Sequence, residues 1–204
     1  VLNILARSVL GLYILDDKPD DITLSNMIRQ SLNLIAKFPT IVAYSYQALR
    51  HLYKGKTLSI RHPDPELTTA QNFLYLIKGT NPPFTKLEAD LLDLMLVLHA
   101  EHGGGNNSTF TMRVTSSSET DIYSSVTSAI GSLKGPLHGG ANVRVLEMME
   151  NIKSHVKDWT DEEEVENYLL KILNKQANDF SGKIYGVGHA VYTISDPRAL
   201  ILKS

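Results

Sequence analysis

The amino-acid sequence predicts an all-α fold, and three observations carry that prediction. Apolar residues recur with the helical period along most of the 204 residues. Helix start and stop signals, such as Thr85 with Glu88 and the glycine at Gly79, border the periodic stretches. No stretch predicts a ladder of strands, and no internal repeat is found.

Two helices are predicted first. A helix is predicted over residues 23–37, with an apolar face made of Leu24, Met27, Ile28, Leu32, Ile35 and Ala36. We expect Pro39 to end this helix and to lie in the first turn of the next one, over residues 40–53.

A third helix follows a connector over residues 54–63. Asp64 and Pro65 have the form of an N-cap with proline at the first helical position. We expect this helix to run to Lys78 and to stop at Gly79.

The next helix is opened by a capping box of Thr85 and Glu88. It ends with His99 and His102. It is apolar nearly all round, which is typical of a helix buried in a core or in a subunit interface. Its apolar residues are Leu87, Leu91, Leu92, Leu94, Met95, Val97 and Leu98.

Three more helices are predicted in the remainder of the chain. One covers residues 116–133, and one covers 161–174 and opens with a capping box of Thr160 and Glu163. Between them, a helix after Pro136 has the inner face Val143, Val145, Leu146, Met148 and Met149. Because glycines cluster at 135–142, we expect a change of domain there.

Composition excludes several function classes. The 20 basic and 22 acidic residues nearly balance, which argues against nucleic acid or an anionic membrane as partner. No apolar run reaches the ~18 residues that a membrane span needs. The chain has no cysteine, which excludes disulfides and thiolate metal sites and fits a reducing compartment such as the cytoplasm. It starts inside an apolar run and stops where a helix begins, so we expect a fragment of a longer protein.

Three histidines flanked by glycine are the main functional signal: His102, His138 and His189. Glycine neighbours let a ligand approach the imidazole and the backbone closely. Three such sites predict one pocket for a compact, polar, anionic molecule. The sequence Asp196-Pro197-Arg198 adds a guanidinium fork suited to a carboxylate.

Each of these signals has a plainer alternative. His138 is expected just before a helix, where the helix dipole favours a neutral imidazole that can donate to a carbonyl oxygen; the alternative is a loop histidine bonded to the backbone. The Gly186-Val187-Gly188 segment either holds a phosphate or a purine edge or only marks a turn. Arg198 is otherwise a solvated arginine.

A metal site is not expected. His99 and His102, three residues apart, fit one helix face beside Glu101, which raises the alternative of a zinc site. The spacing is not the His-Glu-x-x-His pattern, however, and no third ligand is near.

Taken in order, the motifs resemble those of the citrate synthase family. They are His102-x-x-x-Asn106-x-Ser108, Gly135-Pro136-Leu137-His138-Gly139-Gly140-Ala141-Asn142, Gly186-Val187-Gly188-His189-Ala190-Val191-Tyr192 and Asp196-Pro197-Arg198. Each motif alone is modest, but the ordered set is specific, and the likeness extends across essentially the whole chain.

The resemblance implies a helical, dimeric enzyme that condenses oxaloacetate with acetyl-CoA and hydrolyses the resulting citryl-CoA. Residues 1–137 would be part of a large helical domain and residues 138–204 part of a small one that is cut short. The resemblance implies no tightly bound cofactor: acetyl-CoA is a co-substrate, and the longer protein would be a homodimer.

The resemblance also implies roles for single residues. His138 resembles the histidine that hydrogen-bonds the thioester carbonyl of acetyl-CoA, and His189 the one that polarises the ketone of oxaloacetate. His102 and Arg198 resemble oxaloacetate ligands, with Arg198 on a carboxylate.

The remaining roles are those of supporting residues and of the CoA loop. Asn106 and Ser108 resemble residues that orient the catalytic imidazoles. The loop that recognises the CoA adenine through its backbone would comprise Lys183, Ile184, Gly186, Val187 and Gly188.

One departure from the family pattern concerns the general base. In the family it is an aspartate downstream of the Asp-Pro-Arg motif, and no aspartate of this chain matches it. We therefore expect the longer protein to be an enzyme and this piece to be nearly inactive. The alternatives are a 2-methylcitrate synthase that uses propionyl-CoA, and a non-catalytic module that binds CoA or a dicarboxylate.

Overall fold

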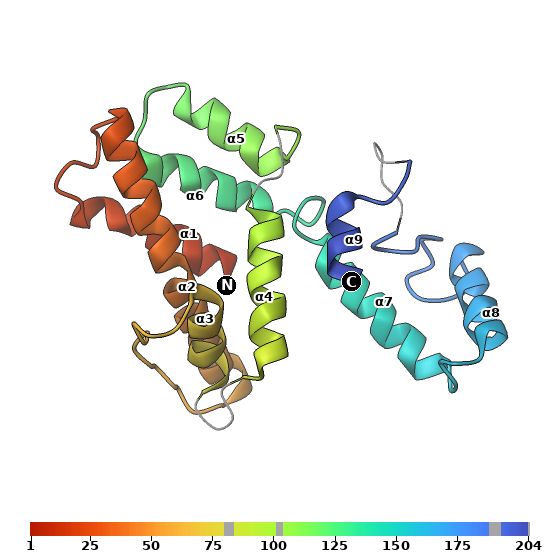
Figure 1. Cartoon of the computed structure of the whole chain (residues 1–204). Helices are drawn as coiled ribbons and strands as arrows, with labels where there is room; N and C mark the ends of the chain where they lie inside the picture. The colour runs from red at the N-terminus through yellow and green to blue at the C-terminus, as the bar shows by residue number, and fades with distance from the viewer. Residues whose placement is uncertain (80–83, 101–103, 188–192, 204) are drawn as a thin grey trace. The chain divides into compact units, whose positions relative to one another are not determined.

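The computed structural model describes residues 1–79, 84–100, 104–187 and 193–203, and Figure 1 shows the course of the chain. Every regular element within these residues is a helix, so the predicted all-α class is confirmed. In the same residues, no helix combines the length and the hydropathy that a bilayer crossing needs.

The chain forms two compact units. One comprises Val1–Lys134 with Leu200–Ser204, and the other comprises Gly135–Ala199. The change of unit falls at the edge of the glycine-rich segment 135–142. The division into parts of a large domain (1–137) and a small domain (138–204) stays a prediction.

The core of the first unit is built by three helices. The helix α1 (Leu2–Gly11), which η1 (Leu12–Leu15) extends, packs against α2 (Leu24–Lys54) and α6 (Ile122–Leu133). Their shared core consists of Leu5, Val9, Leu34, Ile122, Tyr123 and Ile130. Full burial of one such side chain contributes about 1.5–3 kcal/mol, so this cluster contributes several kcal/mol to the unit's stability.

Small polar side chains line the contact of α5 (Asn107–Ser116) with α6. The hydroxyl oxygens of Thr115 and Ser128 lie 2.9 Å apart, and Asn107 Nδ2 donates to Ser132 Oγ at 2.7 Å. These side chains satisfy one another where the two helices meet.

The helix α3 (Thr69–Lys78) packs on α2, and α4 (Lys86–His99) packs on α3. Gln47 of α2 is 2% exposed and donates from Nε2 to the carbonyl oxygens of Leu76 (3.1 Å) and Ile77 (2.8 Å). Those carbonyls lie in the last turn of α3, where no helical N–H reaches them. The predicted stop at Gly79 is confirmed, with φ at 101°.

The predicted break at Pro39 is wrong, because α2 runs without interruption from Leu24 to Lys54. A proline inside a helix removes one N–H and with it one helical hydrogen bond. Leu34 and Ala43, on either side of Pro39, are both buried. Packing on both sides outweighs the local preference for a break.

Two predicted helix starts are also wrong. The helix α3 begins after Thr68, which forms a capping box with Gln71, whereas Asp64 accepts a turn hydrogen bond from the Glu66 N–H. The predicted helix over 116–133 is the end of α5, a turn and then α6, whose N-cap is Asp121. In both places a better cap stands further along the chain.

The second unit is built on α7 (Ala141–His155) and α8 (Glu162–Leu173), and α9 (Pro197–Lys203) follows near the end of the chain. The core of this unit is Met148, Ile152, Val156, Tyr168 and Ile172.

The expectations for α7 and α8 are confirmed only in part. Met148 is buried, but Val143 and Leu146 of the predicted inner face of α7 are 56% and 66% exposed. Asp161 caps α8, whereas Thr160 donates to Asp158, so the expected Thr160 capping box is wrong.

The leucine-rich helix α4 lies on the surface of the chain rather than in its core. Ala89 is its one buried side chain. Leu87, Leu91 and Met95 follow one another at four-residue spacing and are 69%, 41% and 43% exposed. The core alternative is therefore wrong for this chain, while the subunit-interface alternative stays a prediction.

The carboxylate of Asp16 links η1, α2 and α6. Its side chain is 3% exposed and accepts hydrogen bonds from Tyr123 Oη (2.6 Å), Arg29 Nη2 (2.6 Å), Gln30 Nε2 (3.1 Å) and the Lys18 N–H (2.9 Å). Burial by itself raises the pKa of the Asp16 carboxyl, but these hydrogen bonds outweigh it and hold that pKa below its ordinary value. Burial and the bond to Asp16 raise the pKa of Tyr123 to about 12.

Replacing Asp16 with Asn keeps the shape of the side chain and removes the charge. At pH 7 we expect the free energy of unfolding to fall by about 1–3 kcal/mol, because buried donors lose a charged acceptor. Because the folded pKa is depressed, the carboxylate stabilises fully above the unfolded pKa of ~3.9, and its contribution is lost as the pH falls towards the folded value. The gap between wild type and variant should therefore narrow below about pH 4.

Urea unfolding followed by circular dichroism at several pH values measures this gap. Asp17→Asn is the matched control, since Asp17 is its exposed neighbour. Equal stability of the two variants at pH 7 would contradict the assigned role of Asp16.

Candidate active site

His138 lies in a tight turn that leads directly into α7. The Gly135 carbonyl accepts from the N–H groups of both His138 and Gly139, each at 3.0 Å. Gly140 is the N-cap of α7, and no side chain caps that helix. The prediction that His138 stands just before a helix is confirmed, and its side chain is half-buried.

The turn needs glycine at position 140. A Cβ atom there would lie 2.3 Å from the Pro136 carbonyl oxygen, far inside van der Waals contact. The close contact between the backbone at Gly140 and that at Pro136 thus fixes the position of His138 relative to the first turn of α7.

Arg198 already has an acidic partner. Its Nη2 donates to Asp196 Oδ2 at 2.6 Å, and its Nε lies 3.1 Å and 3.2 Å from the two carboxylate oxygens. The Arg198 and Asp196 side chains are 35% and 23% exposed. A carboxylate ligand would therefore meet a guanidinium that Asp196 holds in place and partly neutralises.

Asn106 serves as the N-cap of α5. Its Oδ1 accepts from the N–H groups of Ser108 (2.8 Å) and Thr109 (3.2 Å). This is the ordinary use of asparagine at a helix start. Its predicted role in orienting an imidazole, like that of Ser108, stays a prediction.

The segment Lys183–Val187 folds back onto α7. Ile184 and Tyr185 pack against the core of the second unit, and the Tyr185 N–H donates to Met148 Sδ at 3.4 Å. Gly186 has a φ of 84°, and a Cβ there would come within 3.1 Å of Val145. Tyr185 and Gly186 form a turn, and among the described residues the N–H groups of Ile184 and Gly186 find no acceptor, so a ligand can use them.

The candidate residues are described in two groups. His138, Lys183–Val187 and Arg198 belong to the second unit, and Asn106 and Ser108 belong to the first. His102, His189 and Gly188 lie outside the described residues. In the second unit, the turn of His138 leads into α7, and the Lys183–Val187 segment packs on α7 at Met148. That the two form one site stays a prediction.

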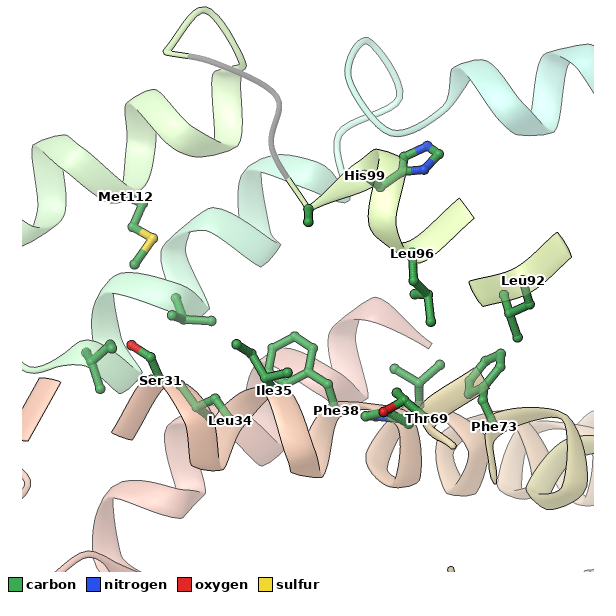
Figure 2. A pocket seen from close by; sticks show the side chains of 15 residues that line it. Ser31, Leu34, Ile35, Phe38, Thr69, Phe73, Leu92, Leu96, His99 and Met112 are labelled. Carbon is green, nitrogen blue, oxygen red and sulfur yellow. The ribbon is translucent and has the colours of Figure 1, made fainter. Parts of the chain in front are cut away.

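An apolar cavity in the first unit was not foreseen from the sequence. Its volume is about 740 Å³, and Figure 2 shows side chains of α2, α3, α4 and α5 around it, with Phe38, Phe73, Leu92 and Leu96 among them. The periodic pattern places Ile35 on an apolar face, but nothing in that pattern indicates that neighbouring helices leave space. None of the predicted catalytic or binding residues lines it.

Metal-binding groups do not cluster in the part of the chain that the structure describes: no three His, Asp or Glu side chains there could hold one ion. His99 Nδ1 lies 2.7 Å from the Met95 carbonyl oxygen within its own helix.

Comparison with known proteins identifies relatives over the full length of the chain. The family model described as "Citrate synthase, C-terminal domain" matches residues 1–204. A citrate synthase of Deinococcus radiodurans is 44% identical over 199 residues, which are 97% of this chain and 46% of that protein. A 2-methylcitrate synthase of Shewanella oneidensis is 39% identical over 170 residues, or 83% of this chain and 40% of that protein.

The fold is similar to that of solved structures as well. The crystal structure of citrate synthase from Pyrobaculum aerophilum matches 99% of this chain and 48% of that one, with a TM-score of 0.72 and 31% identity. The chain thus spans about half the length of the relatives it matches.

Gly140→Ala should distort the turn that carries His138. Because the added methyl group meets backbone, we expect a loss of about 1–3 kcal/mol in the free energy of unfolding. We also expect shifted NMR signals for the amides of residues 135–141. Gly131→Ala in α6 is the control, since its Cβ would meet nothing within 4 Å, and it should be neutral or stabilise by up to about 1 kcal/mol. Equal effects of the two substitutions would refute the steric argument.

Proposed function

The chain belongs to the citrate synthase family, and from this premise we propose that its residues take part in condensing oxaloacetate with acetyl-CoA to give citrate and CoA. The observation that carries the proposal is the position of His138, which stands in a glycine-rich turn opening onto the uncapped N-terminus of α7.

His138 would donate a hydrogen bond to the thioester carbonyl of acetyl-CoA. When a base removes a proton from the methyl carbon, negative charge develops on that carbonyl oxygen. The partial positive charge at the α7 N-terminus favours an anion nearby, and a preformed donor stabilises it without reorganisation. The enolate carbon then attacks the ketone carbon of oxaloacetate, which His189 would polarise, and hydrolysis of citryl-CoA releases citrate and CoA.

Arg198 and His102 would bind oxaloacetate. The ion pair with Asp196 supports a role of Arg198 as a carboxylate ligand, because it fixes the guanidinium before the ligand arrives. Lys183–Gly188 would bind acetyl-CoA, and the unused N–H groups of Ile184 and Gly186 support that assignment.

His138→Ala should lower oxaloacetate-dependent thiol release from acetyl-CoA about 10²–10⁴-fold in the longer protein, since a positioned donor is lost. Release is followed with a thiol-reactive dye, and this chain adds no background because it contains no cysteine. His51→Ala is the control, as His51 lies exposed near the C-terminal end of α2. No release by the longer protein with either acetyl-CoA or propionyl-CoA would favour a non-catalytic binding module.

The same assay on the 204-residue chain tests a further expectation from the resemblance, namely that the base is not among these residues. We propose little or no release by the chain alone. Appreciable citrate formation by the verified chain would overturn that part of the proposal.

Propionyl-CoA is the alternative acyl donor. The similarity of this chain to a 2-methylcitrate synthase supports that alternative. One methylene group in an apolar pocket changes binding by only ~1–3 kcal/mol. The ratio of kcat/KM for acetyl-CoA and propionyl-CoA decides between the two donors.

We also propose that the longer protein is a homodimer and that α4 lies in the interface. The exposed row of Leu87, Leu91 and Met95 supports this, because such a contiguous apolar row marks an interaction surface. The double substitution Leu91→Lys and Met95→Lys should convert dimer to monomer in light scattering. Lys substitutions at Glu147 and Glu150, which are exposed on α7, are the control. A dimer that survives the α4 substitutions would rule out this interface.

A further inference from the structure

The loop that joins α8 to the Lys183–Val187 segment has an unusual backbone. Three of its residues other than glycine have positive φ: Lys175 (61°), Asn178 (58°) and Phe180 (58°). Side chains with a Cβ disfavour this region, so such residues persist only where surrounding contacts hold them.

The contacts that hold this loop converge on Asp179. Its Oδ2 accepts from Tyr185 Oη at 2.6 Å, and its Oδ1 accepts from the Ser181 N–H at 3.1 Å. The hydroxyl oxygens of Ser181 and Tyr185 lie 3.4 Å apart, and Ser181 Oγ accepts from the Lys183 N–H at 3.2 Å. One carboxylate thus ties residue 179 to residue 185 across the intervening turn.

Tyr185 transmits this link to α7. Its ring packs against the core of the second unit, and its N–H donates to Met148 Sδ. The hydrogen bonds from Tyr185 and Ser181 lower the pKa of Asp179 to about 2, so the carboxylate stays charged at neutral pH. Gly186 follows directly, and its N–H makes no hydrogen bond to the described residues.

We propose that Asp179 is a positioning residue: through Ser181 and Tyr185 it holds residues 179–187 in the conformation that presents the backbone N–H groups of Ile184 and Gly186 to acyl-CoA. This inference rests on the proposed function, because it takes Lys183–Val187 as part of the CoA-binding segment. The loop would then be ordered before CoA binds. In a loop that is ordered in only a fraction of the molecules, the apparent Kd is raised by the inverse of that fraction.

Two variants and one control test this role in the 204-residue chain. Asp179→Asn weakens the acceptor, and Tyr185→Phe removes one hydroxyl and keeps the ring in the core. Asp158→Asn is the matched control: Asp158 is another exposed loop carboxylate of the second unit, and it accepts from the Thr160 N–H (2.8 Å) and hydroxyl (2.6 Å).

Two readouts are measured on all four proteins. Hydrogen exchange of the Ser181, Lys183 and Tyr185 amides reports the order of the loop, and calorimetric titration with coenzyme A reports binding. For Asp179→Asn and Tyr185→Phe we expect faster exchange at these amides and an about tenfold higher Kd, as follows if the competent fraction drops tenfold. Circular dichroism and exchange in α8 should match wild type in every variant.

The outcomes separate this inference from the proposed function. Unchanged exchange, or an unchanged Kd for coenzyme A in Asp179→Asn, overturns the positioning role. An equal rise of the Kd in Asp158→Asn overturns it too, because the loss of affinity would then not be specific to the Asp179 carboxylate. A wild-type chain that binds no coenzyme A also overturns it, while thiol release by the longer protein decides separately whether the enzymatic function stands.

Discussion

The first unit depends on an ionised carboxylate that is almost wholly withdrawn from water. Asp16 stands at the end of η1, and its four donors come from the loop that follows and from two helices. Burying this charge is unfavourable unless every donor is in place, so the arrangement admits few alternatives. The hydrogen bonds to Asp16 fix the positions of α2 and α6 relative to η1. The apolar core between α1, α2 and α6 packs in the same arrangement.

The helical elements were predictable where a cap and a periodic pattern agree. Thr85 with Glu88 and the stop at Gly79 are both local, and each is observed as the sequence predicts. The prediction failed where tertiary packing decides the outcome. Pro39 is a helix breaker by local chemistry, yet burial of Leu34 and Ala43 carries α2 through it. A single sequence does not show which neighbouring helix covers a given turn.

The candidate site shows the same limit. The position of His138 before a helix could be predicted, because glycines and the following apolar pattern mark that boundary. The pairing of Arg198 with Asp196 could not, since nearby residues of opposite charge pair only when backbone and rotamers allow it. Asn106 is the N-cap of α5, which is a common role of asparagine. The motif around it predicts a role in orienting an imidazole and does not indicate the cap. Asp179 escaped notice because its importance lies in a partner six residues along the chain.

The bond between Tyr123 and Asp16 spans 107 residues, and that between Thr127 and the Ala6 carbonyl spans 121. During synthesis at ~5–20 residues per second, α1 and α2 must therefore wait for α6 to leave the ribosome before their shared core can close. Their apolar faces stay uncovered for that interval. The second unit closes within a single contiguous stretch of the chain and makes more local contacts, which favours faster folding. Destabilising changes near Asp16 should thus act first on the yield of nascent protein and only then on the finished molecule.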